Sequence, residues 1–232
     1  MSEAVSAQWI RRAFEDARNL DGSMNERLDA LTNSAREHNP AASAAVDRLV
    51  ERLRQNGAGD AAPKPGDAMP PFALPDEEGR IVSLQDLLRG GPTVITFHRG
   101  HWCPYCRISM NTLAKAHDEI VRRGAQMVAI VPDRQAFAAE MKADSNVPFP
   151  VLTDMDNGYA LSLNLAIWVG TEMEEFMRSF GRDLPRYQGN DSWTLPIPAT
   201  FVVAKDGRIK ARFVDPDYRH RMAVDDLLAA LA

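Results

Sequence analysis

The two cysteines of this chain, Cys103 and Cys106, form a Cys-x-x-Cys pair. An apolar, β-branched run at 93–97 precedes the pair, and apolar residues at helical spacing follow it over 107–123. A helix N-terminus offers unpaired N–H groups and a partial positive charge, which favour the thiolate, the nucleophile of thiol–disulfide chemistry. We therefore expect Cys103 to be the reactive thiol, with a low pKa and the greater exposure. Cys106, one helical turn on, is expected to be buried and placed to close a disulfide with Cys103.

Two other uses of the cysteine pair are less well supported. His98 and His101 precede it, so zinc binding is an alternative. A structural zinc site usually draws its ligands from two separated knuckles, however, and the sequence contains no second Cys-x-x-Cys and no His-x-x-x-His. A structural disulfide would close a very small loop and would constrain little of the unfolded chain. The spacing therefore favours a redox pair that needs neither a metal nor a cofactor.

The bulk composition is that of a soluble globular protein. The 232 residues are 45% hydrophobic and 25% charged, with a net charge of −5. The mild acidity and the absence of a basic cluster give no support for nucleic-acid binding. No apolar run reaches the ~18 residues that a membrane span needs, and residues 1–19 lack the apolar core of a signal peptide. We expect a cytoplasmic protein, in which a lone Cys-x-x-Cys is more often catalytic than structural.

The first 57 residues predict a helical extension. Three helices are indicated, with a capping box at Ser23 and Glu26 and an N-cap and first-turn pair at Asn39 and Pro40. Glycine and proline then mark a linker at 58–71. The extension could serve an interaction or a homodimer, although a cap on the main core is the simpler expectation.

Residues 66–232 predict an α/β domain. A strand–helix–strand order is followed by a hairpin through Asp206-Gly207 and a last helix, which is the layout of a thioredoxin-like fold with a central mixed sheet flanked by helices. The strands are expected at 80–84, 93–97, 127–131, 149–152, 199–204 and 208–214, and the helices at 107–123, 134–142, 160–165, 171–180 and 222–231.

Pro198 precedes the hairpin and must begin its first strand, because proline cannot occupy the middle of a central strand. In thioredoxin-like proteins, a cis-proline at this place faces the Cys-x-x-Cys turn. That position favours a cis peptide bond before Pro198.

Several stretches resemble the peroxiredoxins of the AhpC/TSA family, in particular peroxiredoxin-like proteins with the motif Arg-Gly-x-Trp-Cys-Pro-Tyr-Cys. Here that motif runs from Arg99 to Cys106. The resemblance covers the chain from Gly66 to the C-terminus, and the helical extension also occurs in this group. The further similar stretches are 66–74, 189–196 and 215–218, together with Arg221.

The resemblance implies a thiol-dependent peroxidase acting on hydrogen peroxide or organic hydroperoxides in cell redox homeostasis. Cys103 would attack the terminal oxygen of the hydroperoxide O–O bond and become a sulfenic acid. Cys106 would then condense with it as the resolving thiol. A thioredoxin- or glutaredoxin-type reductant would reduce the disulfide. An external thiol or the Cys103 of a second subunit could replace Cys106.

Two positions depart from the family pattern. Gly100 stands where peroxiredoxins have a peroxide-binding Thr or Ser, and the region of Pro198 lacks the family's arginine. Arg99, Arg107 and Arg221 are candidates for the missing cation. Because Gly100 and Pro198 suit a thioredoxin-like enzyme, the alternative function is a thiol–disulfide oxidoreductase acting on protein or glutathione disulfides. A redox-sensing or metal-binding module is a third, non-enzymatic hypothesis.

Other side chains near the motif are secondary candidates. Trp102 could shield the thiolate, and Trp193 could line the same cleft. His98 and His101 could tune Cys103 or carry protons. His117 lies on the apolar face of the Cys helix and is expected to be a buried structural histidine.

Overall fold

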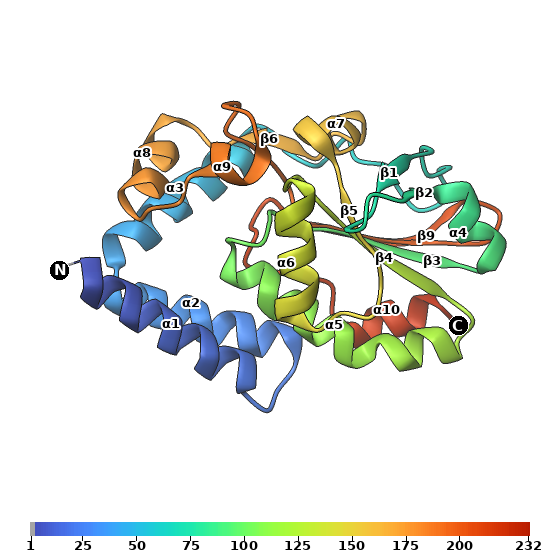
Figure 1. Ribbon diagram of the computed structural model, residues 1–232, viewed down its shortest axis with the longest axis horizontal. Coiled ribbons are helices and arrows are strands. Elements are labelled where there is room, and N and C mark those ends of the chain that lie inside the picture. Colours follow the sequence, from blue (N-terminus) through green and yellow to red (C-terminus); the bar gives the residue numbers. More distant parts are fainter. Residues whose placement is uncertain (1–2) are drawn as a thin grey trace.

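The centre of the fold is a five-stranded mixed sheet (Figure 1), and its strand order is β5-β4-β3-β8-β9. The computed structural model describes residues 3–232, with side chains from residue 8 onward. The first three strands in chain order are parallel, and the last two form an antiparallel hairpin, which confirms the α/β thioredoxin-like fold. The strands are β3 (Thr93–Phe97), β4 (Gln126–Val131), β5 (Val151–Thr153), β8 (Ala199–Val203) and β9 (Ile209–Val214).

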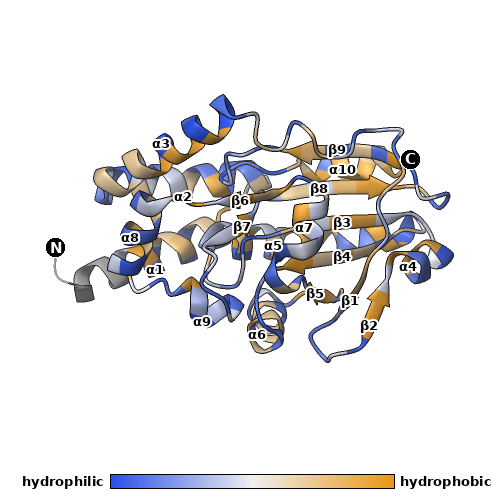
Figure 2. Cartoon of the chain, turned by 90° about the horizontal axis from the view of Figure 1, so that it is seen from above, coloured by the Kyte–Doolittle hydropathy of each residue, from blue (hydrophilic) through white to orange (hydrophobic). Residues whose placement is uncertain are grey.

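Each face of the sheet packs against its own layer. Alternation along β3 sends Val94 into one apolar cluster and Ile95 and Phe97 into another. Figure 2 shows these strands as largely hydrophobic. The first cluster joins the sheet to α5 (Pro104–Arg122), α6 (Gln135–Ser145) and α10 (Val224–Ala230). The second joins it to α4 (Leu84–Gly90), α7 (Gly158–Ser162) and the hairpin of β1 (Ala73–Pro75) and β2 (Ile81–Ser83).

The three predicted N-terminal helices are confirmed, and they share the main core. Helices α1 and α2 pack against α5, and α3 packs against α8. Leu28 and Leu31 of α2 are buried in the same cluster as Met110 of α5. None of the described helices is both long and apolar enough to cross a membrane. The bounds are α1 (Glu3–Asn19), α2 (Met24–His38), α3 (Pro40–Gln55) and α8 (Thr171–Ser179).

Both predicted helix caps are confirmed. The backbone N–H of Ser23 donates to Oε2 of Glu26 (2.7 Å), and the backbone N–H of Glu26 donates to Oγ of Ser23 (3.3 Å). Asn39 accepts a hydrogen bond from the N–H of Ala42 (3.1 Å), and Pro40 is the first residue of α3. These side chains satisfy helix N–H groups that have no partner within the helix.

Residues 58–71 form a series of turns, and residues 66–69 among them lie along the β8–β9 hairpin. The N–H of Gly66 donates to the carbonyl of Ile209 (2.8 Å), and the N–H of Met69 donates to the carbonyl of Gly207 (2.9 Å). Met69 is buried, so this segment is attached to the sheet by both backbone and side-chain contacts.

The largest secondary-structure error lies at 160–165. The helix at this place, α7 (Gly158–Ser162), begins before residue 160 and ends at Ser162. It ends there because Asn164 adopts a left-handed conformation (φ 56°) that a helix cannot contain. The chain then forms β6 (Ala166–Trp168), which pairs with β7 (Thr194–Pro196) in a separate two-stranded sheet. The remaining unpredicted elements are β1, α4, the 3₁₀ turn Met155–Asn157 and α9 (Leu184–Gln188).

The prediction of a cis bond before Pro198 is wrong. No cis peptide bond occurs in residues 3–232. The trans chain leads from β7 directly into β8, and the N–H of Ile197 donates to the carbonyl of Leu165 (2.7 Å) on the way. Pro198 does stand immediately before a strand, as proline geometry requires.

We expect Leu28→Ala to lower the free energy of unfolding by about 2–5 kcal/mol, because Leu28 is completely buried between the extension and α5. Denaturant unfolding followed by circular dichroism should show one transition, since both parts share a core. Leu161→Ala is the matched control, because Leu161 is 66% exposed, and should change stability by less than about 0.5 kcal/mol. Two separate transitions in the parent protein would contradict the shared core.

Candidate active site

The two cysteines lie where β3 passes into α5. Cys103 is the N-cap residue of α5, Pro104 is its first residue, and Cys106 lies one turn further on. The Cys103 side chain makes no capping hydrogen bond, so its electrostatic environment depends on other groups. Both cysteines are free and buried, with exposed fractions of 1% and 0%, and the expected exposure of Cys103 is wrong. Cys103 nevertheless lines a cavity, and Cys106 does not.

The two thiols have opposite acidities. Burial by itself raises the pKa of Cys103, but a hydrogen bond from the Cys106 thiol and the charges of Arg99 and Arg221 lower that pKa to about 6. Burial raises the pKa of Cys106 well above its ordinary value, and the hydrogen bond and charge of Cys103 add to this effect. The directions agree with the expected division of labour. Near pH 7, Cys103 is therefore mainly thiolate, and Cys106 holds its proton.

Arg99 and Arg221 approach the thiols from different sides. The backbone N–H of Arg99 donates to Sγ of Cys106 (3.3 Å), and Nη2 of Arg221 lies 3.6 Å from the same sulfur. The Arg99 guanidinium lies 3.8 Å from the ring centre of Tyr218 and 5.0 Å from that of Trp102. It is 5% exposed and lines the cavity, and it makes no hydrogen bond to a carboxylate in the described part of the chain. Arg99 is therefore a buried cation available to an anion beside Cys103.

The space in front of Gly100 is already filled. Gly100 has φ +130°, and a Cβ built on it would lie 2.5 Å from Oδ1 of Asp133 and 2.8 Å from Nε1 of Trp102. Neither of those atoms has a hydrogen-bond partner among the described residues. The Thr or Ser that the family resemblance leads one to expect at this position therefore cannot fit without displacing Trp102 or Asp133.

Asp133 was not among the residues predicted for the site. It is completely buried, and its Oδ2 accepts a hydrogen bond from the N–H of His101 (2.6 Å). Burial raises the pKa of Asp133 to about 7, and the negative charge of Cys103 acts in the same direction. Asp133 follows the end of β4 at the same edge of the sheet as the Cys turn, and that position is the only sequence signal that could have identified it.

The histidines near the motif differ in their roles. Burial, followed by the charge of Arg221, lowers the pKa of His98 to about 3. This side chain is therefore neutral at pH 7 and does not take up a second proton, as a proton carrier would have to. Nε2 of His101 lies 2.9 Å from Oδ2 of Asp144, which Nη2 of Arg107 also contacts at 3.0 Å. Arg107 is thus held by a carboxylate, unlike Arg99.

The predictions for His117 and Trp193 have different outcomes. His117 is half-buried, less than expected, and its ring is tilted by 39° against that of Phe149 with ring centres 5.7 Å apart, in agreement with a structural role. Trp193 is buried beneath Arg178 and does not line the cavity, so its predicted place in the cleft is wrong. In the described part of the chain, no three His, Cys, Asp or Glu side chains converge as a metal site would require.

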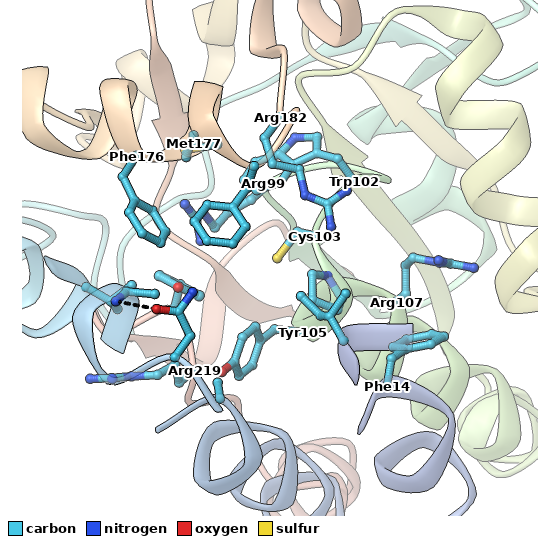
Figure 3. A pocket seen from close by; sticks show the side chains of 18 of the residues that line it. Phe14, Arg99, Trp102, Cys103, Tyr105, Arg107, Phe176, Met177, Arg182 and Arg219 are labelled. Atoms are coloured by element: carbon cyan, nitrogen blue, oxygen red, sulfur yellow. Dashed lines mark hydrogen bonds between the residues drawn. The ribbon is translucent and has the colours of Figure 1, made fainter. Parts of the chain in front are cut away.

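The cavity beside Cys103 has a volume of about 890 Å³. Figure 3 shows the Cys103 sulfur pointing into it, with aromatic and arginine side chains around. Sequence reasoning found Arg99, Trp102 and Cys103, but it missed the walls that the extension and α8 supply. The helical spacing of Met173, Phe176, Met177 and Phe180 was the available signal, because such a stripe must face an apolar partner. The extension and the α8–α9 region supply, among others, Trp9, Phe14, Val46, Met173, Phe176, Met177, Phe180, Arg182 and Tyr187.

We expect Cys106→Ala to raise the pKa of Cys103 by about 1–2 units, because a hydrogen bond to a charged group contributes roughly 1.5–3 kcal/mol. Cys106→Ser should preserve most of the low pKa, since its hydroxyl can still donate. Each variant holds one thiol, so thiolate absorbance at 240 nm against pH measures Cys103 alone. Equal pKa values in the two variants would show that the hydrogen bond is unimportant.

We expect Gly100→Ala to destabilise the protein by at least about 2 kcal/mol more than Gly66→Ala. Both glycines have positive φ, which costs an alanine about 1–2 kcal/mol, but a Cβ on Gly66 would meet nothing within 4 Å. Chemical denaturation measures both, and Gly66→Ala isolates the cost of backbone conformation. Peroxide oxidation of Cys103 should slow only in Gly100→Ala. Equal stability of the two variants would mean that Asp133 and Trp102 move aside freely.

Comparison with known proteins supports the family resemblance. The sequence profile of the AhpC/TSA family matches residues 65–212. A Mycobacterium tuberculosis protein assigned as a peroxiredoxin (Rv2521) is 31% identical over 145 residues, which cover 62% of this chain and 81% of that protein. Peroxiredoxin Bcp of Escherichia coli is 28% identical over 94 residues, covering 40% of this chain and 60% of Bcp.

Solved structures show the same fold. The peroxidoxin BcpB of Mycobacterium tuberculosis superposes with a TM-score of 0.57 at 22% identity, covering 73% of this chain and 96% of that one. A peroxiredoxin 6 mutant of Arenicola marina gives a TM-score of 0.57 at 18% identity, covering 72% and 71%. Together, the matched profile, the relatives and the fold show that this chain belongs to the AhpC/TSA family, as a protein of the peroxiredoxin type.

Proposed function

We propose that Cys103 is the thiol with which this thiol-dependent peroxidase attacks a hydroperoxide, and that Cys106 resolves the product. The observation that carries the assignment is the contrast between the two sulfurs. Cys103 lines the cavity with a pKa of about 6, whereas Cys106 lies behind it with a raised pKa. Only one of the two is therefore both ionised near pH 7 and able to meet a substrate.

The first step forms an S–O bond and breaks the O–O bond. The Cys103 thiolate attacks the terminal oxygen of ROOH, which gives Cys103 sulfenic acid and RO⁻, and RO⁻ takes a proton to become ROH. Arg99 is the group we propose to stabilise the developing negative charge, because it is buried, has no carboxylate partner in the described part of the chain and, unlike Arg221, lines the cavity. It would replace the arginine that the family carries near the late strand.

The second step forms the disulfide. The Cys106 thiol condenses with the sulfenic acid and releases water, and two external thiols then return the disulfide to the dithiol. Both sulfurs lie in one helical turn, so the cycle needs no second subunit and no large movement of α5. The proposal includes a cytosolic setting and a thioredoxin- or glutaredoxin-type reductant.

The alternative, reduction of protein disulfides, fits the burial of Cys103 less well. A protein disulfide must bring its sulfur in line with the attacking thiolate, but Cys103 is 1% exposed and lies within a cavity, away from the outer surface. Small hydroperoxides can enter that space. The same geometry requires the cavity to open, or a small thiol to enter, when the disulfide is reduced.

We expect Cys103→Ser to abolish fast reaction with peroxide, and Cys106→Ser to keep the first turnover but accumulate sulfenic acid. The reason is that Cys106 acts only after the O–O bond is broken. Stopped-flow fluorescence measures the first turnover, and dimedone trapping with mass spectrometry measures the sulfenic acid.

The parent protein is the control, and insulin reduction tests the alternative function. Equal slowing of the first turnover in both serine variants would contradict the assigned roles. Rapid insulin reduction with peroxide turnover no faster than a free thiol would favour the disulfide oxidoreductase.

A further inference from the structure

The size of the cavity is larger than hydrogen peroxide needs. At about 890 Å³ it lies in the range of roughly 300–1,000 Å³ that holds whole organic ligands, whereas a water molecule occupies about 30 Å³ in the liquid. Its walls away from Cys103 are aromatic side chains and methionines, including Phe14, Phe176 and Met177. Such walls adapt to an apolar body of varied shape. The cavity is therefore built for a substrate with a bulky apolar part.

The charges in the cavity wall have one predominant sign. Five arginines and one glutamate line it: Arg11, Arg99, Arg107, Arg182, Arg219 and Glu15. This local excess is opposite to the net charge of −5 of the whole chain. A positively charged pocket in an acidic protein indicates selection for an anion at this place, since the overall field does not attract one.

Not all of these cations are available to a ligand. Arg107 contacts Asp144 (3.0 Å), and Arg219 contacts Asp217 and Asp47 (both 2.7 Å). Glu15 pairs with Arg18. These side chains are neutralised by their partners.

Of the five arginines that line the cavity, three have no carboxylate partner in the described part of the chain: Arg11, Arg99 and Arg182. Arg99 belongs to the reacting centre beside Cys103. Arg182, between α8 and α9, and Arg11, on α1, come from outside the Cys turn. They are thus free to bind a charged group on a part of the substrate that does not react.

We propose that the cavity binds a bulky organic hydroperoxide that carries a carboxylate, with Arg182 and Arg11 binding the carboxylate while the peroxide meets Cys103. The inference rests on the proposed function and names its substrate class. The extension and the α8–α9 region then have a role as specificity elements, because they provide both arginines and most of the apolar wall.

The test compares three peroxides: cumene hydroperoxide, its para-carboxylate and hydrogen peroxide. The first two have the same reacting group and the same apolar body, so their ratio reports the carboxylate. We expect the parent protein to oxidise Cys103 at least about tenfold faster, in kcat/KM, with the carboxylate than with neutral cumene hydroperoxide. The preference should fall as salt is added, because screening weakens the ion pairs.

The variant is Arg11→Gln with Arg182→Gln, and Arg12→Gln is the matched control. Arg12 neighbours Arg11 on α1, but its side chain is 86% exposed and pairs with Asp16 instead of lining the cavity. The double variant should lose the preference for the carboxylate and keep the parent rates with neutral cumene hydroperoxide and hydrogen peroxide. Arg12→Gln should behave as the parent.

A second readout is independent of catalysis. 4-Isopropylbenzoate has the same shape and charge without a peroxide, and calorimetry measures its binding directly. We expect the parent to bind it at least tenfold more tightly than the double variant does.

The outcomes separate the two proposals. Suppose that the protein reacts fast with hydrogen peroxide. Equal rates with the two cumene compounds would then overturn the anion site alone. Equal losses with all three peroxides in the double variant would do the same. Reaction of all three peroxides at the rate of a free thiol overturns the proposed function. In that case, tight 4-isopropylbenzoate binding that depends on Arg11 and Arg182 would still support an anion site, and its absence would overturn that too.

Discussion

The negative charge on a buried sulfur is the constraint on which the whole site depends. A thiolate out of water is unfavourable unless other groups replace the lost hydration. Here the Cys106 thiol donates to it, and Arg99 and Arg221 supply positive charge. The helix N-terminus provides the position but no capping hydrogen bond. Cys106 consequently has two roles: it first stabilises the thiolate, and it then becomes the partner in the disulfide.

Close packing explains why this chain departs from the family pattern at one position. Asp133 and Trp102 occupy the space into which a side chain at Gly100 would project. A Thr or Ser hydroxyl at position 100 would therefore require a smaller residue in place of the buried carboxylate of Asp133. Asp133 itself is costly to ionise, and its raised pKa reflects burial together with the nearby Cys103 charge. The missing hydroxyl and the buried acid are parts of one arrangement.

The N-terminal extension contributes to the environment of the thiolate as well as to the core. Its helices α1 and α2 pack on α5, whose first turn holds both cysteines. The same helices and α8 line the cavity, so Cys103 faces a space of limited volume whose walls combine apolar side chains with arginines. Electrostatic interactions are stronger in such surroundings than in water. Stability and substrate access are thus properties of the same set of contacts. The boundary at 58–71 stays a prediction.

The amino-acid sequence by itself determined the reactive pair, its place between a strand and a helix, the three N-terminal helices and the α/β class, because these follow from local spacing, caps and apolar periodicity. It could not supply the pairing of β6 with β7, the trans bond before Pro198, the burial of Cys103 or the contact of Asp133 with the Gly100 region. Those features depend on contacts between residues that lie far apart in the chain. Only the packed tertiary structure decides them, because burial and the approach of distant charges are set by the whole core and leave no local pattern in the sequence.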